Sequence, residues 1–161
     1  MKQDRYLLAI LVAIGLLVIA SLVLFFIHKD KQAYLPDDTP EGVVHNYALA
    51  LHQRDFERAY GYLVDKEHKP TLDQFRSAFI SRQLDVSSTG LAINNVETMD
   101  GEAWVEVSVI YSPSGPFEEI RRYIENAILV EQEGAWRLSQ MPYPYWGWDW
   151  YQPDSKPLSI P

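Results

Sequence analysis

The sequence predicts an α+β domain preceded by a single transmembrane helix, and three observations lead to this prediction. Residues 6–27 form one apolar run without a charged residue. The first half of the remaining chain carries apolar residues at spacings of three and four, which is typical of amphipathic helices. The second half alternates apolar and polar residues between turn residues, which is typical of antiparallel strands. Helices followed by a meander of strands indicate an α+β domain.

The apolar run, from Tyr6 to Ile27, reads YLLAILVAIGLLVIASLVLFFI. Its 22 residues match the about 20 that cross a hydrocarbon core of roughly 30 Å, and in lipid such a segment must be helical. The run is longer than the roughly 7–15 apolar residues of a cleaved signal peptide and does not end at small residues. We therefore expect an uncleaved signal anchor in the lipid bilayer, with residues 1–5 as a short tail and 28–38 as a juxtamembrane linker.

The basic residues beside the run do not decide its orientation. Lys2 and Arg5 precede it, and Lys29 and Lys31 follow it, so the positive-inside rule gives a tie. The free amino terminus favours a cytoplasmic N-terminus, and a short tail before a large C-terminal domain is the usual layout of a signal anchor. We expect a single-pass protein of the cell membrane whose domain lies outside the cytoplasm.

The charge of the domain excludes one class of partner. Residues 32–161 contain 10 basic and 20 acidic residues. Such a domain repels phosphate backbones, so no nucleic-acid partner is expected.

Local signals set the expected elements of the domain. Thr39 caps a first helix, with Pro40 at its first position and Glu41 near the positive end of its dipole. A second helical pattern follows a bend at 52–55. Thr71 and Gln74 form a capping box at the start of a third helix.

The strands are expected after Gly90. Asp100-Gly101 is a strong hairpin turn before the alternating segment 104–111. The segment 117–132 is ambiguous, since Ile120, Ile124 and Ile128 also fit a helix. A long strand is favoured because Glu133-Gly134 then turns into 135–139, which gives a C-terminal hairpin.

Three short segments resemble the nuclear transport factor 2-like domains. They are Thr39-Pro40-Glu41 opening a helix, Arg54-Asp55-Phe56-Glu57-Arg58-Ala59-Tyr60 with an Asp-Phe pair before Ala, and the final hairpin Gly134-Ala135-Trp136-Arg137-Leu138. The resemblance implies that residues 39–140 form a cystatin-like cone, with a strongly curved antiparallel sheet wrapped round the helices and a pocket inside. It also implies a small membrane-anchored bacterial protein. Family enzymes need a carboxylate or His beside a Tyr or an acid in that pocket, and no such set aligns on this chain.

Eight aromatic residues are expected to face the domain interior and are candidates for lining a ligand pocket: Tyr47, Tyr60, Phe75, Phe79, Trp104, Tyr111, Tyr123 and Trp136. An apolar ligand would suit such a lining. The alternative, which is favoured, is that these side chains simply fill the core between helices and sheet.

Two histidines, His45 and His52, lie seven residues apart on the first expected helix. Two turns of helix separate them, so they would bind one ion only with a third ligand, and boundary histidines are the favoured interpretation. No catalytic triad, phosphate-binding glycine loop or dinucleotide fingerprint occurs in the sequence. No catalytic residue, metal or cofactor is therefore predicted.

The tail, residues 141–161, is rich in aromatic residues and proline. Six aromatics lie within the 12 residues MPYPYWGWDWYQ, and Tyr145, Trp146, Trp148 and Trp150 are its candidates for an interaction surface. Three interpretations stay open. The tail folds back over the open end of the sheet, sits at the lipid interface, or stacks on sugars or on a protein partner.

Together these features predict a membrane-anchored, non-enzymatic binding or protein-interaction module of the bacterial cell envelope, with a possible protein partner there. The alternative is a small apolar-ligand carrier or a pocket enzyme of the isomerase or dehydratase type.

Overall fold

The computed structural model describes residues 3–27, 33–113, 115 and 119–153. The chain divides into two units, Met1–Ala33 and Tyr34–Pro161, and each is described by itself. Residues 1–2 of the expected N-terminal tail, 28–32 of the expected linker, 117–118 of the expected long strand and 154–161 of the expected tail lie outside the described residues.

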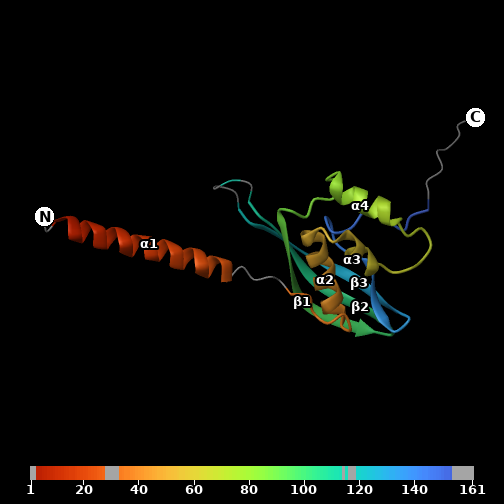
Figure 1. The fold of residues 1–161 in the computed structure, drawn as a ribbon. Helices are drawn as coiled ribbons and strands as arrows, with labels where there is room; N and C mark the ends of the chain where they lie inside the picture. Colours follow the sequence, from red (N-terminus) through yellow and green to blue (C-terminus); the bar gives the residue numbers. More distant parts are fainter. Residues whose placement is uncertain (1–2, 28–32, 114, 116–118, 154–161) are drawn as a thin grey trace, which may run out of the picture. The chain divides into compact units, whose positions relative to one another are not determined.

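The first unit contains one helix, α1 (Gln3–Ile27) (Figure 1). Its described side chains, Tyr6 and residues 10–23, are all exposed. Among the residues described here, no helix is both long enough and apolar enough to cross a membrane, so the expected span is not found.

The second unit begins with three helices whose ends follow the predicted capping chemistry. In α2 (Pro40–Gln53), the Gly42 N–H donates to Thr39 Oγ1 at 3.1 Å. The helix ends at Arg54, and Asp55 caps the short α3 (Phe56–Gly61). The capping box predicted for α4 (Leu72–Ile80) is formed by Thr71 and its partner three residues on. The predictions at Thr39 and Thr71 are confirmed, whereas the cap at Asp55 was not predicted.

Four antiparallel strands follow, and they pair in chain order: β1 (Thr89–Met99), β2 (Glu102–Tyr111), β3 (Arg121–Gln132) and β4 (Ala135–Gln140). The Asp100-Gly101 and Glu133-Gly134 pairs both have positive φ at their two residues, as two-residue hairpin turns require. The segment from Arg121 is therefore a strand and not a helix, and the predicted α+β class is confirmed.

The expectation of a strongly curved sheet is wrong, because the sheet is not strongly curled (Figure 1). Strong curvature needs bulges or glycines repeated along the strands. In the described strands the register shifts only between Ile93 and Asn95 and between Ile128 and Leu129. The single strand glycine, Gly90, lies one residue from the start of β1.

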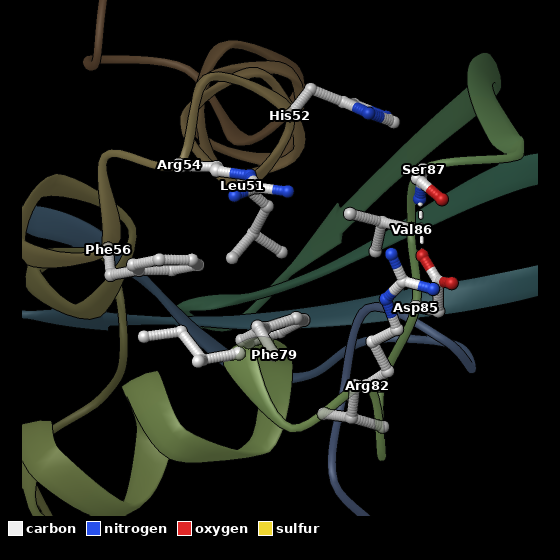
Figure 2. Close-up of a pocket in the computed structure, with 11 residues that line it drawn as sticks. Leu51, His52, Arg54, Phe56, Phe79, Arg82, Asp85, Val86 and Ser87 are labelled. Carbon is white, nitrogen blue, oxygen red and sulfur yellow. Dashed lines mark hydrogen bonds between the residues drawn. The ribbon is translucent and has the colours of Figure 1, made fainter.

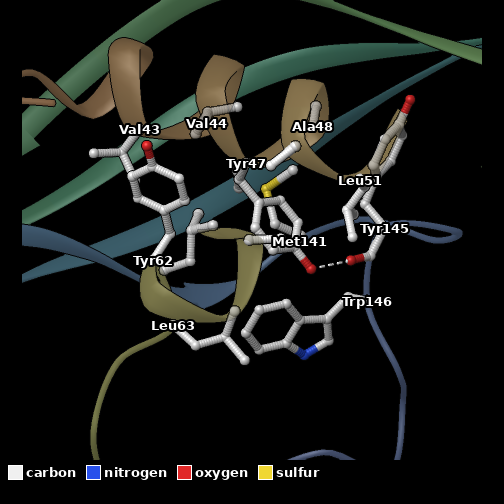
Figure 3. Packing of buried hydrophobic residues seen from close by; sticks show 14 of the residues in the cluster. Val43, Val44, Tyr47, Ala48, Leu51, Tyr62, Leu63, Met141, Tyr145 and Trp146 are labelled. Atoms are coloured by element: carbon white, nitrogen blue, oxygen red, sulfur yellow. Dashed lines mark hydrogen bonds between the residues drawn. The ribbon is translucent and has the colours of Figure 1, made fainter. Parts of the chain in front are cut away.

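The core lies between α2 and one face of the sheet. Alternate residues of β2 point toward α2 and are fully buried: Ala103, Val105, Val107 and Val109. Burying a side chain of this size contributes about 1.5–3 kcal/mol. Val43, Val44, Tyr47 and Leu51 of α2 cover them (Figure 3).

The domain begins before α2, inside the segment expected to be a linker. Asn46 is fully buried, and its side chain accepts the Leu35 N–H at 2.7 Å and donates to the Leu35 carbonyl at 2.7 Å. It also donates to Asp37. Since a buried amide left without these partners would be costly, residues 35–37 are fixed on the domain.

Candidate functional site

The aromatic tail folds back onto the domain and becomes part of its core (Figure 3). Tyr145 is fully buried, and Trp146 and Trp150 are each 8% exposed. The Trp150 ring lies 5.0 Å from the Phe75 ring of α4 and 5.1 Å from the Trp146 ring, measured between centroids. Three of the four tail candidates therefore serve packing in this structure.

Buried hydrogen bonds attach the tail to α2 and β1. The Tyr47 hydroxyl donates to the Tyr145 carbonyl at 2.6 Å. The Tyr145 hydroxyl lies 3.2 Å from His52 Nε2 and 3.1 Å from Thr89 Oγ1. Burial raises the pKa of Tyr145 to about 12, opposed by the contact with Thr89. Both tyrosines are therefore neutral hydrogen-bonding groups at neutral pH.

Two tail aromatics stay at the surface. Trp148 is 84% exposed and Tyr143 is 60% exposed. Large aromatic side chains that are this exposed to solvent are candidates for contact with a partner.

Trp148 and Tyr143 line a groove of about 520 Å³. The tail supplies its aromatic lining and Gln152. Polar side chains from β3, β4 and the loop after α3 complete it: Lys66, Glu125, Ser139 and Gln140. We call this the tail groove. Flat aromatic surfaces beside hydrogen-bonding groups suit a protein segment, because such pairs combine contact area with orientation.

The eight predicted pocket aromatics do not come together in one place. Four of them form one packed cluster on the helices: Tyr47, Tyr60, Phe75 and Phe79. Tyr111 and Tyr123 pair edge to face on the sheet with ring centroids 5.7 Å apart. Trp104 of β2 is 46% exposed, and Trp136 of β4 is half-buried against the core.

A separate pocket of about 150 Å³ lies where α2 and α4 end (Figure 2). We call it the helix-end pocket. Its apolar lining consists of Leu51, Phe56, Phe79, Ile80, Leu84 and Val86, and its polar lining of His52, Arg54, Arg82, Asp85 and Ser87. Among the eight predicted aromatics, only Phe79 lines it.

The titratable groups of the helix-end pocket are tuned by burial and by neighbouring charges. Burial lowers the pKa of His52, so its imidazole is neutral at pH 7. The hydrogen bond from Ser87 and the nearby charges of Arg82 and Arg54 lower the pKa of Asp85. The backbone N–H of Ser87 donates to the Asp85 carboxylate at 2.9 Å. The pocket thus carries two cations and one anion at neutral pH.

The histidines do not form a metal site in the part of the chain that the structure describes, where no group of three or more potential ligands gathers. His52 contacts Tyr145 with ring centroids 6.0 Å apart. His68 lies exposed in the loop between α3 and α4.

The arginines of the helix-end pocket were not among the candidate site residues predicted from the sequence. The sequence does contain one indication of Arg54. A helix commonly ends with glycine in the left-handed conformation, and here an arginine occupies that position directly after the first helix. Arg54 and Arg82 both have φ of 60°.

Comparison with known proteins identifies no family. No family model matches the chain, and no curated protein matches it. Among solved structures, the chain is similar to the solution structure of RPA3114, a SEC-C motif containing protein from Rhodopseudomonas palustris. The two chains are 15% identical, the match covers 66% of this chain and 79% of the other, and the TM-score is 0.49. A likeness of this degree carries no argument about function.

Proposed function

We propose that this protein is a membrane-anchored, non-enzymatic binding module of the bacterial cell envelope, and that the tail groove contacts a protein partner there. The observation that carries the proposal is the exposure of Trp148 and Tyr143 beside the groove, on a tail that buries Tyr145, Trp146 and Trp150. Exposed aromatics flanked by polar groups are enriched at protein interfaces.

The partner is a protein with a basic contact surface. The chain outside its first 31 residues has twice as many acidic as basic residues, and complementary charge speeds association and selects partners. Glu125 lines the groove itself.

The anchor in this proposal is the apolar run of residues 6–27, with the domain on the extracytoplasmic side. Its support is the sequence: 22 residues without a charge, a length that suits a bilayer. The run belongs to a helix that forms a unit apart from the domain. That the domain is related to the nuclear transport factor 2-like domains is also part of this proposal.

Photo-crosslinking in intact membranes tests the groove. A photoreactive phenylalanine analogue is placed at position 148 of the full-length chain, and the matched control carries it at position 104, an exposed Trp on β2 outside the groove. We expect one discrete crosslinked protein from position 148 and none from position 104, with Tyr143→Ala reducing the yield. Equal labelling from both positions would contradict the proposal.

A small-ligand carrier is the second candidate, and the helix-end pocket favours it. The pocket holds an apolar floor and His52, whose Nε2 lies 3.2 Å from the Tyr145 hydroxyl. Convergent polar groups over an apolar floor are typical of small-ligand sites. Binding of a small molecule by a chain that yields no crosslink at position 148 would support this candidate over the first.

A further inference from the structure

The helix-end pocket has the size of a small apolar group. Its volume is about 150 Å³, and an apolar cavity of about 150 Å³ accommodates a molecule as large as benzene. The floor consists of aliphatic and aromatic side chains, among them Leu51, Phe79 and Val86 (Figure 2). About six non-hydrogen atoms of an apolar chain therefore fill it.

The rim of this pocket is basic in a domain that is otherwise acidic. Arg54 comes from the end of α2, Arg82 from the turn after α4, and Asp85 is the single acidic side chain of the lining. The Asp85 carboxylate already accepts a hydrogen bond from Ser87. With His52 neutral, the rim carries one net positive charge, which matches a monoanion better than a dianion.

Both guanidinium groups have hydrogen-bonding capacity to spare. Within the described residues, neither the Arg54 nor the Arg82 guanidinium takes part in a hydrogen bond or an ion pair. Each guanidinium offers five N–H donors in a planar fork that fits a carboxylate. Both guanidinium groups line the same pocket, so both are available to donate hydrogen bonds to an anion at its rim.

The backbone at both arginines is one that glycine adopts more readily. Arg54 and Arg82 each have φ of 60°, a conformation that is unfavourable for an L-residue because its Cβ lies too close to the following carbonyl oxygen. Such strain is characteristic of functional sites. Two residues of the same charge therefore have this conformation at the rim of one pocket.

We infer that the helix-end pocket binds a carboxylate attached to a short apolar chain, with Arg54 and Arg82 holding the carboxylate and Leu51, Phe79 and Val86 covering the chain. Two sources present this chemistry: a free short-chain organic acid, and the C-terminal carboxylate of a peptide that ends in an apolar residue. The inference makes the carrier candidate specific and does not depend on the anchor or on the tail groove.

The test is isothermal titration of the full-length chain in phosphatidylcholine nanodiscs, with empty nanodiscs as the blank. The probes are hexanoate and its uncharged analogue hexanol. We expect saturable hexanoate binding and no saturable hexanol binding. Since a hydrogen bond to a charged group is worth about 1.5–3 kcal/mol, R54Q and R82Q should each weaken hexanoate binding about tenfold or more. The matched control R76Q, an exposed arginine of α4 outside the pocket, should change it less than about twofold.

Two further arms make the outcome decisive. Arg82→Gly keeps a backbone that favours φ of 60°, so it tests loss of binding in a chain that stays folded. A tetrapeptide ending in leucine, compared with its C-terminal amide, separates the two sources: tighter binding of the free acid than of hexanoate identifies a peptide terminus, and weaker binding identifies a small acid. Equal affinities of hexanoate for the parent chain, R54Q and R82Q, or the lack of any saturable binding by the acids, would overturn the inference. Failure of this test leaves the crosslink at position 148 unaffected.

Discussion

The hydrogen bond between Tyr47 and the tail gives a prediction whose size follows from the structure. Tyr47 and Tyr145 are both fully buried. Among the described residues, the Tyr47 hydroxyl is the one donor to the Tyr145 carbonyl, at 2.6 Å. Tyr47→Phe keeps the ring and its packing against Phe75, and it leaves a buried carbonyl without a partner.

Leaving such a carbonyl unpaired costs about 1–3 kcal/mol of unfolding free energy. For a domain of this size, with an unfolding entropy of about 2.1 cal/mol/K per residue, this lowers the melting temperature by roughly 4–12 °C. Melting of the full-length chain is followed by near-ultraviolet circular dichroism, which reports the packing of the tail tryptophans.

The matched control is Tyr60→Phe. The Tyr60 hydroxyl donates to the Pro70 carbonyl at 2.9 Å, and it is only partly buried, so water replaces the lost bond. This change should lower the melting temperature less than Tyr47→Phe does. If the two variants melt together, or if Tyr47→Phe melts with the parent chain, the tail is not held by this bond and the reasoning fails.

Three further predictions concern the tail and the helix-end pocket. Trp150→Ala, at a side chain 8% exposed, should cost about 3–5 kcal/mol in urea unfolding, whereas Trp148→Ala, at 84% exposed, should change stability by less than about 0.5 kcal/mol; comparable losses would contradict the assignment of these two residues. Arg82→Gly should raise the free energy of unfolding by about 0.5–1 kcal/mol, because relief of the strained backbone exceeds the added chain entropy; a loss of stability would show that the guanidinium supports the fold. Burial lowers the pKa of His52 in the folded state, so the unfolded chain takes up the proton first as the pH falls, and stability present above about pH 6.5 is lost as the pH falls below that value. His52→Gln should flatten this part of the stability profile; a profile parallel to that of the parent chain would refute the role of burial.

The parts of the fold that were predicted from the sequence depend on local chemistry. Thr39 and Thr71 cap their helices because a side-chain oxygen satisfies nearby backbone N–H groups. The turns at Asp100-Gly101 and Glu133-Gly134 form because glycine tolerates a positive φ. These preferences act over three or four residues, so the sequence reveals them directly.

The burial of the tail depends on contacts between distant residues. Trp150 meets Phe75 across 75 positions of the chain, and no local pattern distinguishes it from the exposed Trp148 two residues away. The helix-end pocket likewise arises where α2, α4 and residues 84–87 meet. In the sequence, each arginine is a non-glycine residue close to the end of a helix. Only the structure shows that both arginines lie at the rim of one pocket.

Membrane attachment through residues 6–27 is the central claim of the proposed function. The direct measurement is extraction of membranes from cells that express the full-length chain, first with alkaline carbonate and then with a non-ionic detergent. An uncharged helical segment of 22 residues should keep the protein in the carbonate-washed pellet and release it only into detergent. Recovery of the intact chain in the carbonate supernatant, or in the soluble fraction before any wash, would contradict the account.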